Sequence, residues 1–363
     1  MLNKTFQIVS NNKNCTSIIE FTFRNFLIGT CFIIIFCLSV LGNSIVIGMI
    51  AKLRRRSIRS ITNIYLLNLA IADLMRSVMC MPTTLLSELS RCWLLGPLLC
   101  KLAAYLQPVA VSASAYTLAV IAVERFYAIC RPLQSRKWQS KRRALAMIAL
   151  VWIISFISNI LSLFFYKASP YKSAWNCRSV VSPLVDFIYQ LYLTFILLLI
   201  PLTIMVVLYG NVIATLKTAI YLDCDKAITV KNFDDNNLDA LIAKKRVTRM
   251  LIILVIAFLI CWTPSFIWWL LIKTTDLLEA YHVYNDSMNT ILTLLTYIST
   301  CTNPITYCFM NEGFRDNVFA HYLCCSSVYE KHKRNRSTCE SPSSPGFLSR
   351  FIPVGNRTPV SVL

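Results

Sequence analysis

The sequence predicts an all-α membrane protein, a bundle of seven transmembrane helices with a short amphipathic helix after the seventh span. Three observations predict this fold class. The 363 residues are 56% hydrophobic and only 15% charged, which is far from the composition of a soluble protein. Long apolar stretches recur along the chain without the alternation of membrane β-strands. The net charge of +19 is concentrated between alternate stretches.

The seven spans are identified by length, because a bilayer core of about 30 Å needs roughly 20 mostly apolar helical residues. We expect them at roughly Phe26 to Ile50, Thr62 to Leu86, Leu99 to Ile129, Ala144 to Phe165, Leu184 to Leu208, Val247 to Leu271 and Met288 to Met310. Four prolines inside the spans predict kinks that free backbone carbonyls: Pro82, Pro201, Pro264 and Pro304.

Lys and Arg in the short connections predict the orientation, because cytoplasmic loops carry an excess of both. They cluster after the first, third and fifth spans, for example at Arg54, Arg142 and Lys244. We therefore expect a plasma-membrane protein with an extracellular segment (1–25), the bundle (26–310), a juxtamembrane amphipathic helix (311–325) and a cytoplasmic tail (326–363). Three sequons fall in segments assigned to the outside, where we expect glycosylation: Asn3, Asn14 and Asn285.

The stretch after the seventh span places apolar residues from Phe314 to Leu323 at helical spacing, which is typical of a helix lying on the inner leaflet. Cys324 and Cys325 follow it directly. Juxtamembrane cysteines of this kind are palmitoylation candidates. The alternative is that both remain free thiols.

Polar side chains inside the spans are functional candidates by default, because each is costly in a bilayer. Asn43, Asp73, Gln107, Ser114 and Asn303 are such residues, and hydrogen bonds could join them in the bundle interior. The alternative is a static polar cluster that only holds helices together.

Short motifs follow one another in order along these spans. They are Gly42-Asn43, Leu69-Ala70-Ile71-Ala72-Asp73, Glu124-Arg125-Phe126, Trp152, Pro201 with Tyr209, Cys261-Trp262-Thr263-Pro264 and Asn303-Pro304-Ile305-Thr306-Tyr307. Together they resemble the motifs of the rhodopsin-like G-protein-coupled receptors, over about residues 26 to 325. The resemblance implies a receptor that activates a heterotrimeric G protein and also binds arrestin and a receptor kinase.

The resemblance also implies an activation switch. Arg125 would pair with Glu124 without a signal and turn toward the G protein when the sixth span moves. The predicted switch residues are Glu124, Arg125, Tyr209, Trp262, Pro264, Asn303, Pro304 and Tyr307. The alternative for Glu124 and Arg125 is an ion pair that only anchors the third helix at the membrane surface.

Within that superfamily, Tyr127 to Gln139 resembles the second intracellular loop of the cholecystokinin, gastrin and sulfakinin receptors. The stretch from Tyr105 to Ser114 is more similar to orexin- and neuropeptide-FF-type receptors. The first likeness implies a C-terminally amidated, cholecystokinin- or sulfakinin-like neuropeptide as extracellular ligand, and G proteins of the calcium-mobilising Gq class. A peptide of the orexin or neuropeptide-FF type is the alternative.

The resemblance places the ligand cavity between the outer halves of the spans. Its expected lining is Gln107, Val111, Arg178, Phe266, Trp269, Lys273 and Tyr297. This mostly aromatic lining suits an aromatic, amidated peptide end better than a biogenic amine. In the cholecystokinin group, an Arg at the position of Arg178 is taken to meet an acidic or sulfated tyrosine. That group's sixth-span Asn and Arg are replaced here by Trp269 and Ile272.

Four cysteines fall outside the membrane and permit three pairings. The resemblance implies a disulfide between Cys100 and Cys177, which would tie the loop after the fourth span to the third span. A second bridge between Cys15 and Cys92 is a weaker expectation.

Arg76 lies three residues after Asp73 on one helix face, so a buried ion pair is available. Receptors of the resembled class often hold a sodium ion at this Asp, for which Ser114 and Asn303 would be co-ligands. A guanidinium nearby would compete with the ion, so we expect little sodium effect and no other cofactor. The alternative is that Arg76 points away from Asp73, toward the outer cavity.

Other function classes lack their signatures. The seventh span has no Lys for a retinal Schiff base, and the three His residues form no HExxH motif. We therefore expect neither a light sensor nor an enzyme, and the basic charge is explained by topology rather than by a nucleic-acid partner. A transporter or channel remains the alternative, although the sequence has no internal repeat.

Overall fold

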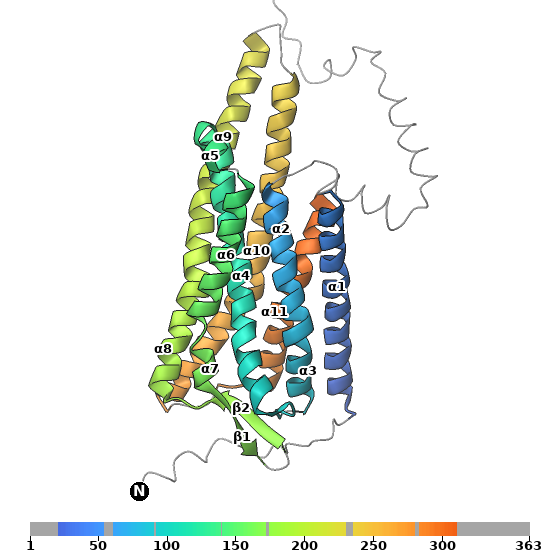
Figure 1. The fold of residues 1–363 in the computed structure, drawn as a ribbon, viewed down its shortest axis with the longest axis vertical. Helices are drawn as coiled ribbons and strands as arrows, with labels where there is room; N and C mark the ends of the chain where they lie inside the picture. The colour runs from blue at the N-terminus through green and yellow to red at the C-terminus, as the bar shows by residue number, and fades with distance from the viewer. Residues whose placement is uncertain are drawn as a thin grey trace, which may run out of the picture. The chain divides into compact units, whose positions relative to one another are not determined.

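The computed structural model describes residues 21–53, 61–90, 92–138, 140–171, 174–229, 235–279 and 283–310. Long helices lie side by side in a bundle (Figure 1). The described elements are α1 (Phe23–Leu53), α2 (Ile61–Met75), η3 (Arg76–Cys80), α3 (Met81–Ser90), α4 (Gly96–Cys130), α5 (Pro132–Trp138), α6 (Lys141–Ser158), α7 (Ser162–Phe165), β1 (Tyr166–Tyr171), β2 (Ala174–Ser179), α8 (Pro183–Thr194), η4 (Phe195–Leu199), α9 (Ile200–Thr229), α10 (Asp235–Leu277) and α11 (Asp286–Met310).

Among the described residues, six helical runs are long and apolar enough to cross a membrane. They coincide with the first six predicted spans. The helix of the seventh, α11, is rich in Thr and Ser and is not among these six, but it packs against α1 and α10 within the same bundle. The central helix is α4, which contacts α2, α6 and α9. The predicted helical bundle is therefore confirmed.

The second and fifth spans each contain one π-turn, written η3 and η4. The Met81 amide donates to the Arg76 carbonyl, and the Ile200 amide donates to the Phe195 carbonyl. A proline follows directly in both cases, and proline has no N–H to donate and crowds the carbonyl four residues before it. The wider turn lets each helix continue through its proline, so that the second span runs without interruption to Ser90.

Close packing of the first and seventh spans depends on the absence of a side chain at Gly42. A Cβ atom built there would lie 2.8 Å from Cγ of Pro304. Asn43, the next residue, is fully buried and donates hydrogen bonds to the carbonyls of Ser39 and Thr300, at 2.9 and 3.0 Å. The close approach of the Pro304 ring to Gly42 and the hydrogen bond from Asn43 to Thr300 thus hold α1 against α11.

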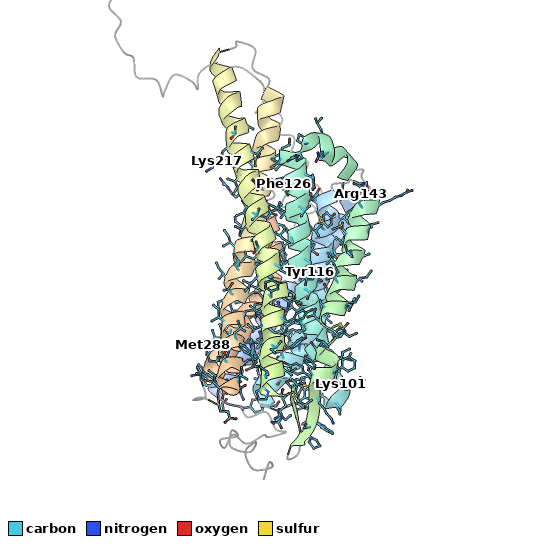
Figure 2. The ribbon with its side chains drawn as sticks, turned by 90° about the vertical axis from the view of Figure 1, so that its left-hand side faces the viewer. Lys101, Tyr116, Phe126, Arg143, Lys217 and Met288 are labelled. Carbon is cyan, nitrogen blue, oxygen red and sulfur yellow. A yellow bond between two sulfur atoms is a disulfide. The ribbon has the colours of Figure 1, made fainter. Side chains whose placement is uncertain are left out.

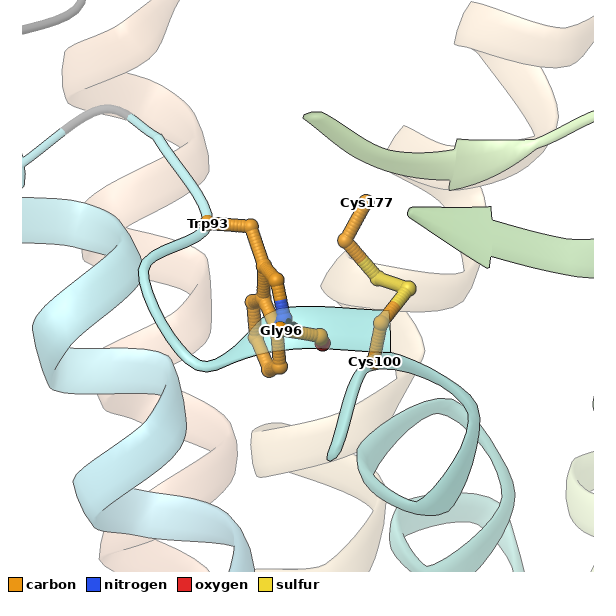
Figure 3. Close-up of a disulfide and its surroundings, with 4 residues drawn as sticks. All are labelled: Trp93, Gly96, Cys100 and Cys177. Atoms are coloured by element: carbon orange, nitrogen blue, oxygen red, sulfur yellow. Dashed lines mark hydrogen bonds between the residues drawn. A yellow bond between two sulfur atoms is a disulfide. The ribbon is translucent and has the colours of Figure 1, made fainter. Parts of the chain in front are cut away.

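A β-hairpin covers one end of the bundle and departs from the all-α prediction. Strands β1 and β2 pair antiparallel, with Ala168 opposite Cys177. Counting 20-residue apolar runs cannot detect strands this short. The predicted disulfide between Cys100 and Cys177 is present and ties β2 to the first turn of α4 (Figure 3).

The loop before α4 is held against the same hairpin. Backbone hydrogen bonds join Trp93 and Trp175 in both directions, at 2.8 and 3.0 Å. The Trp93 indole donates to the Gly96 carbonyl at 2.7 Å, and Gly96 has a φ of +73°, which glycine adopts without strain. Cys92 is also disulfide-bonded, but Cys15 lies outside the described residues, so the predicted pairing stays a prediction.

The labelled side chains distinguish the two ends of the bundle. We call them the hairpin end, where Lys101 and Met288 lie, and the Arg125 end, where Phe126, Arg143 and Lys217 lie (Figure 2).

Asn285, at the hairpin end, is exposed, and its side-chain oxygen accepts hydrogen bonds from the backbone amides of Ser287 and Met288, which caps α11. The expected glycosylation of Asn285 stays a prediction. Asn3, Asn14, the 311–325 helix, Cys324 and Cys325 lie outside the described residues.

Candidate functional site

A cavity of about 440 Å³ lies at the hairpin end, between α3, α4, α8, α10 and α11 and beneath the hairpin. Four of the predicted ligand residues line it, namely Gln107, Val111, Phe266 and Trp269. Further aromatic side chains complete this lining: Trp93, Tyr166, Tyr189 and Trp262. Aromatic side chains therefore form a substantial part of the cavity wall, and contact of the predicted residues with a ligand stays a prediction.

The remaining lining combines apolar side chains with polar side chains that are mostly uncharged. It includes Thr83, Thr84, Ser87, Gln190, Ser265, Asn289, Thr293 and Thr296. The Tyr166 hydroxyl adds a further uncharged polar group. Burial and the nearby Asp186 carboxylate raise the pKa of its phenol well above the usual range, so the group stays neutral. Such groups can donate and accept hydrogen bonds without requiring a charge on the ligand.

Glu88 is the one acidic side chain that lines the cavity in the described part of the chain. Its carboxylate accepts hydrogen bonds from Asn289 at 3.2 Å and Thr290 at 2.7 Å. Glu88 lies beyond the predicted second span, which ends at Leu86, and was therefore not among the predicted site residues. The helix in fact continues to Ser90, so Glu88 stands on its last turn, facing α11.

Three residues expected to contact the ligand do not line this cavity. Arg178 is exposed on β2. Lys273 donates to Asp186 at 2.7 Å, and this ion pair joins the hairpin ends of α10 and α8. Tyr297 is fully buried behind the cavity wall, where its hydroxyl is 2.7 Å from that of Thr84. Neither of the two cations expected in the cavity lining, Arg178 and Lys273, therefore lines it.

Arg76 is buried in the bundle interior and does not form the ion pair with Asp73 that was considered from the sequence. Its guanidinium instead stacks on two rings, with its central carbon 4.4 Å from the centre of Trp262 and 4.6 Å from that of Tyr297. One nitrogen, Nη1, donates to Ser299 at 3.1 Å. Asp73 accepts a hydrogen bond from Asn303 at 2.5 Å. Aromatic stacking therefore takes the place of direct charge pairing.

A second, much smaller cavity of about 20 Å³ lies beside Asp73 and is lined also by Arg76, Ser114 and Asn303. These include the residues that would hold a sodium ion. Nε and Nη2 of Arg76 are buried there without a hydrogen-bond partner, and they would repel a cation in the same small space. The residues present therefore do not suit a sodium ion.

At the Arg125 end, an ion pair and a hydrogen bond hold the Arg125 guanidinium. Arg125 pairs with Glu124 at 2.9 Å and donates to the Thr62 hydroxyl on α2 at 2.6 Å. Tyr209 on α9 and Tyr307 on α11 are both buried. The guanidinium is thus held by an acid on its own helix and a hydroxyl on a neighbouring one.

Two prolines of the predicted switch lie inside the helices that connect the ends of the bundle. Pro264 interrupts the hydrogen bonding of α10 two residues after Trp262, and Pro304 does so in α11 next to Asn303. Both helices are therefore locally weakened between the hairpin end and the Arg125 end.

Comparison with known proteins identifies the class. Residues 42–307 match the model of the 7 transmembrane receptor (rhodopsin family), so the chain belongs to that family of multi-pass membrane receptors, which are not enzymes. The chain is 34% identical to the cholecystokinin receptor of Xenopus laevis over 88% of its length and 81% of that protein.

Two further relatives agree with this class. The human cholecystokinin receptor type A is 33% identical, over 88% of this chain and 86% of that receptor. The gastrin/cholecystokinin type B receptor of Rattus norvegicus is 28% identical, over 88% and 84%. The protein is therefore a rhodopsin-family G-protein-coupled receptor related to the cholecystokinin receptors, and the predicted resemblance is confirmed.

Proposed function

We propose that this protein is a plasma-membrane receptor for a C-terminally amidated neuropeptide with an aromatic end, and that it activates Gq-class G proteins. The hairpin end faces outside and the Arg125 end faces the cytoplasm, where arrestin and a receptor kinase also bind. Arg143 and Lys217 at the Arg125 end support this orientation, because cytoplasmic loops are basic. The relatives named as cholecystokinin receptors support a peptide ligand.

The single observation that carries the proposal is the lining of the large cavity. Its aromatic faces suit an aromatic side chain, and no Lys, Arg or His lines it among the described residues. A free peptide carboxylate would therefore enter without a compensating cation, which is unfavourable. A neutral terminal amide can instead pair with the uncharged polar groups, such as Gln107 and Asn289.

Activation follows from the connection between the two ends. A ligand pressing on Phe266 and Trp262 would bias the bend of α10 at Pro264. Movement of the Arg125 end of α10 would open space for the G protein. Arg125 would then leave Glu124 and Thr62 for the G protein, while Tyr209 and Tyr307 turn inward to hold it.

The test is calcium release in cells that express the receptor with a promiscuous Gα subunit. A panel of amidated neuropeptides is compared with the same peptides as free acids, and surface labelling verifies delivery. We expect at least one amidated peptide to evoke calcium release and its free acid to be at least about tenfold less potent. The tenfold loss corresponds to about 1.4 kcal/mol, the order of the cost expected when a carboxylate replaces the neutral amide. Equal potency of amides and acids would contradict the proposal.

A further inference from the structure

The charge of the large cavity is negative. Among the described residues that line it, Glu88 alone carries a formal charge. The two groups that hold its carboxylate, the Asn289 amide and the Thr290 hydroxyl, are neutral donors. They orient the carboxylate but do not cancel its charge, so an occupant of the cavity meets an anion.

None of the three nearby cations in the described part of the chain forms an ion pair with the Glu88 carboxylate. Arg24 on α1 lies behind Thr290, to whose hydroxyl it donates at 3.2 Å, and it neither pairs with Glu88 nor lines the cavity in the described structure. Lys273 is already paired with Asp186. Arg76 is stacked behind the wall on Trp262 and Tyr297. The field of Arg24 weakens the charge of Glu88, but Glu88, unlike Arg24, lines the cavity.

From this arrangement we infer that the ligand carries a guanidinium or ammonium side chain close to its aromatic, amidated end, and that Glu88 binds it. This inference rests on the proposed function. A cationic side chain entering the cavity gains a charge-assisted hydrogen bond to an oriented carboxylate. An acidic side chain at the same place would be repelled. The receptor therefore selects peptides with a basic side chain over peptides with an acidic one, in contrast to the acidic or sulfated ligand group that the resemblance to the cholecystokinin receptors implies.

The neighbouring residues fit this role. Asn289 and Glu88 both line the cavity, so the carboxylate is supported from α11 and does not need to rearrange when a cation arrives. Trp93 lines the same cavity and can add a cation–π contact. Arginine suits both contacts better than lysine, because its planar group can stack and pair at once.

The test uses amidated tetrapeptides that end in phenylalanine amide. One residue, either Arg, Gln or Asp, is moved through the three positions before the phenylalanine, and calcium potency is measured. In the wild type we expect the best Arg peptide to be at least about tenfold more potent than its Gln counterpart, with Asp weaker than Gln. Glu88→Gln keeps one acceptor oxygen and the side-chain shape, and it should bring the Arg-to-Gln ratio to about one.

Three further variants provide controls. Glu279 is an exposed carboxylate at the hairpin end that does not line the cavity, so Glu279→Gln should leave the Arg-to-Gln ratio unchanged. Arg24→Gln removes the cation behind Thr290 and should keep or raise the ratio. Glu88→Lys should reverse the order, so that the Asp peptide exceeds the Arg peptide.

The outcomes separate the two levels of the proposal. If Gln or Asp peptides equal the Arg peptides in the wild type, the inference fails and the proposed function stands. If Arg is preferred equally by wild type and Glu88→Gln at matched surface levels, the assignment to Glu88 fails. If no amidated peptide evokes a response in cells with verified surface receptor, the proposed function fails and the inference with it.

Discussion

The guanidinium of Arg76 stacks on the indole of Trp262, with 4.4 Å from its central carbon to the ring centre. Trp262 lines both the large cavity and the small cavity beside Asp73. Arg76 therefore contacts a side chain that a ligand can touch and, at the same time, borders the polar cluster in the bundle interior. A desolvated contact of this kind contributes on the order of 2 kcal/mol.

This arrangement predicts that sodium has little effect on agonist affinity. Arg76 already supplies a positive charge to the cavity beside Asp73, so sodium at physiological concentration should change wild-type agonist affinity by less than about twofold. Removing the guanidinium in Arg76→Leu should allow sodium to bind and reduce agonist affinity about fivefold or more. Agonist binding measured with sodium and with an inert organic cation at equal ionic strength checks both. Strong sodium sensitivity of the wild type, unchanged in Arg76→Leu, would refute the idea.

Arg125→Ala should separate binding from signalling. Arg125 lies at the opposite end from the cavity, held by Glu124 and Thr62, so its loss removes the G-protein contact and leaves ligand contacts intact. We expect surface expression and peptide affinity within about twofold of wild type, with G-protein activation reduced to background. Radioligand binding and calcium release on the same cells measure the two properties. Normal signalling by this variant would show that Arg125 lacks the assigned role.

Glu124→Gln is the complementary change. It weakens the ion pair that holds Arg125 while preserving the shape of the side chain. Ligand-independent signalling should therefore rise by about two- to tenfold, because losing the charge of this partly buried ion pair destabilises the resting arrangement by on the order of 1 kcal/mol. Inositol phosphate accumulation without ligand, normalised to surface receptor, is the measurement. Basal signalling at or below the wild-type level would mean that the pair only anchors α4.

The disulfide makes a prediction about additivity. Cys100→Ser and Cys177→Ser break the same bond, which ties the hairpin over the cavity, so the double variant should be no worse than either single variant. Peptide binding and surface delivery should each fall strongly in all three. Losses that add in the double variant would indicate that the two thiols act separately.

Gly42→Ala should weaken the contact between α1 and α11. The added methyl group would meet the Pro304 ring at 2.8 Å, and a proline ring cannot move aside. We expect a destabilisation of about 1–3 kcal/mol, seen as a lower melting temperature of the detergent-purified receptor. Gly210→Ala is the matched control, because a methyl group there meets nothing within 4 Å. Equal melting temperatures of the two variants would contradict the packing argument.

The sequence predicts the spans well because a bilayer imposes one simple requirement, a helical run of apolar residues. It does not predict the hairpin at Ala168 and Cys177, whose strands are too short for that requirement to apply. The π-turns before Pro82 and Pro201 are local compensations for a missing N–H, and the sequence indicates only that a kink is needed.

The cavity is predicted in part. Gln107 and Phe266 were expected there from the resemblance to the receptor family, which assigns the outer halves of these spans to the cavity, and both line it. The places of Lys273 and Arg76 depend on partners far away in the sequence, namely Asp186 and Tyr297, and residue spacing along one helix cannot reveal them. Glu88 was missed because the second span continues one turn beyond its apolar run.

Peptide-stimulated nucleotide exchange on a purified G protein tests the central claim most directly. The purified receptor is placed in lipid nanodiscs with a Gq heterotrimer, and binding of a non-hydrolysable GTP analogue is followed with the most potent amidated peptide. We predict that the peptide accelerates exchange by about tenfold or more with the wild type, and that Arg125→Ala abolishes this acceleration although it still binds the peptide. Unchanged exchange in the presence of bound peptide, or a peptide-evoked current across a bilayer that holds the receptor alone, would contradict the account.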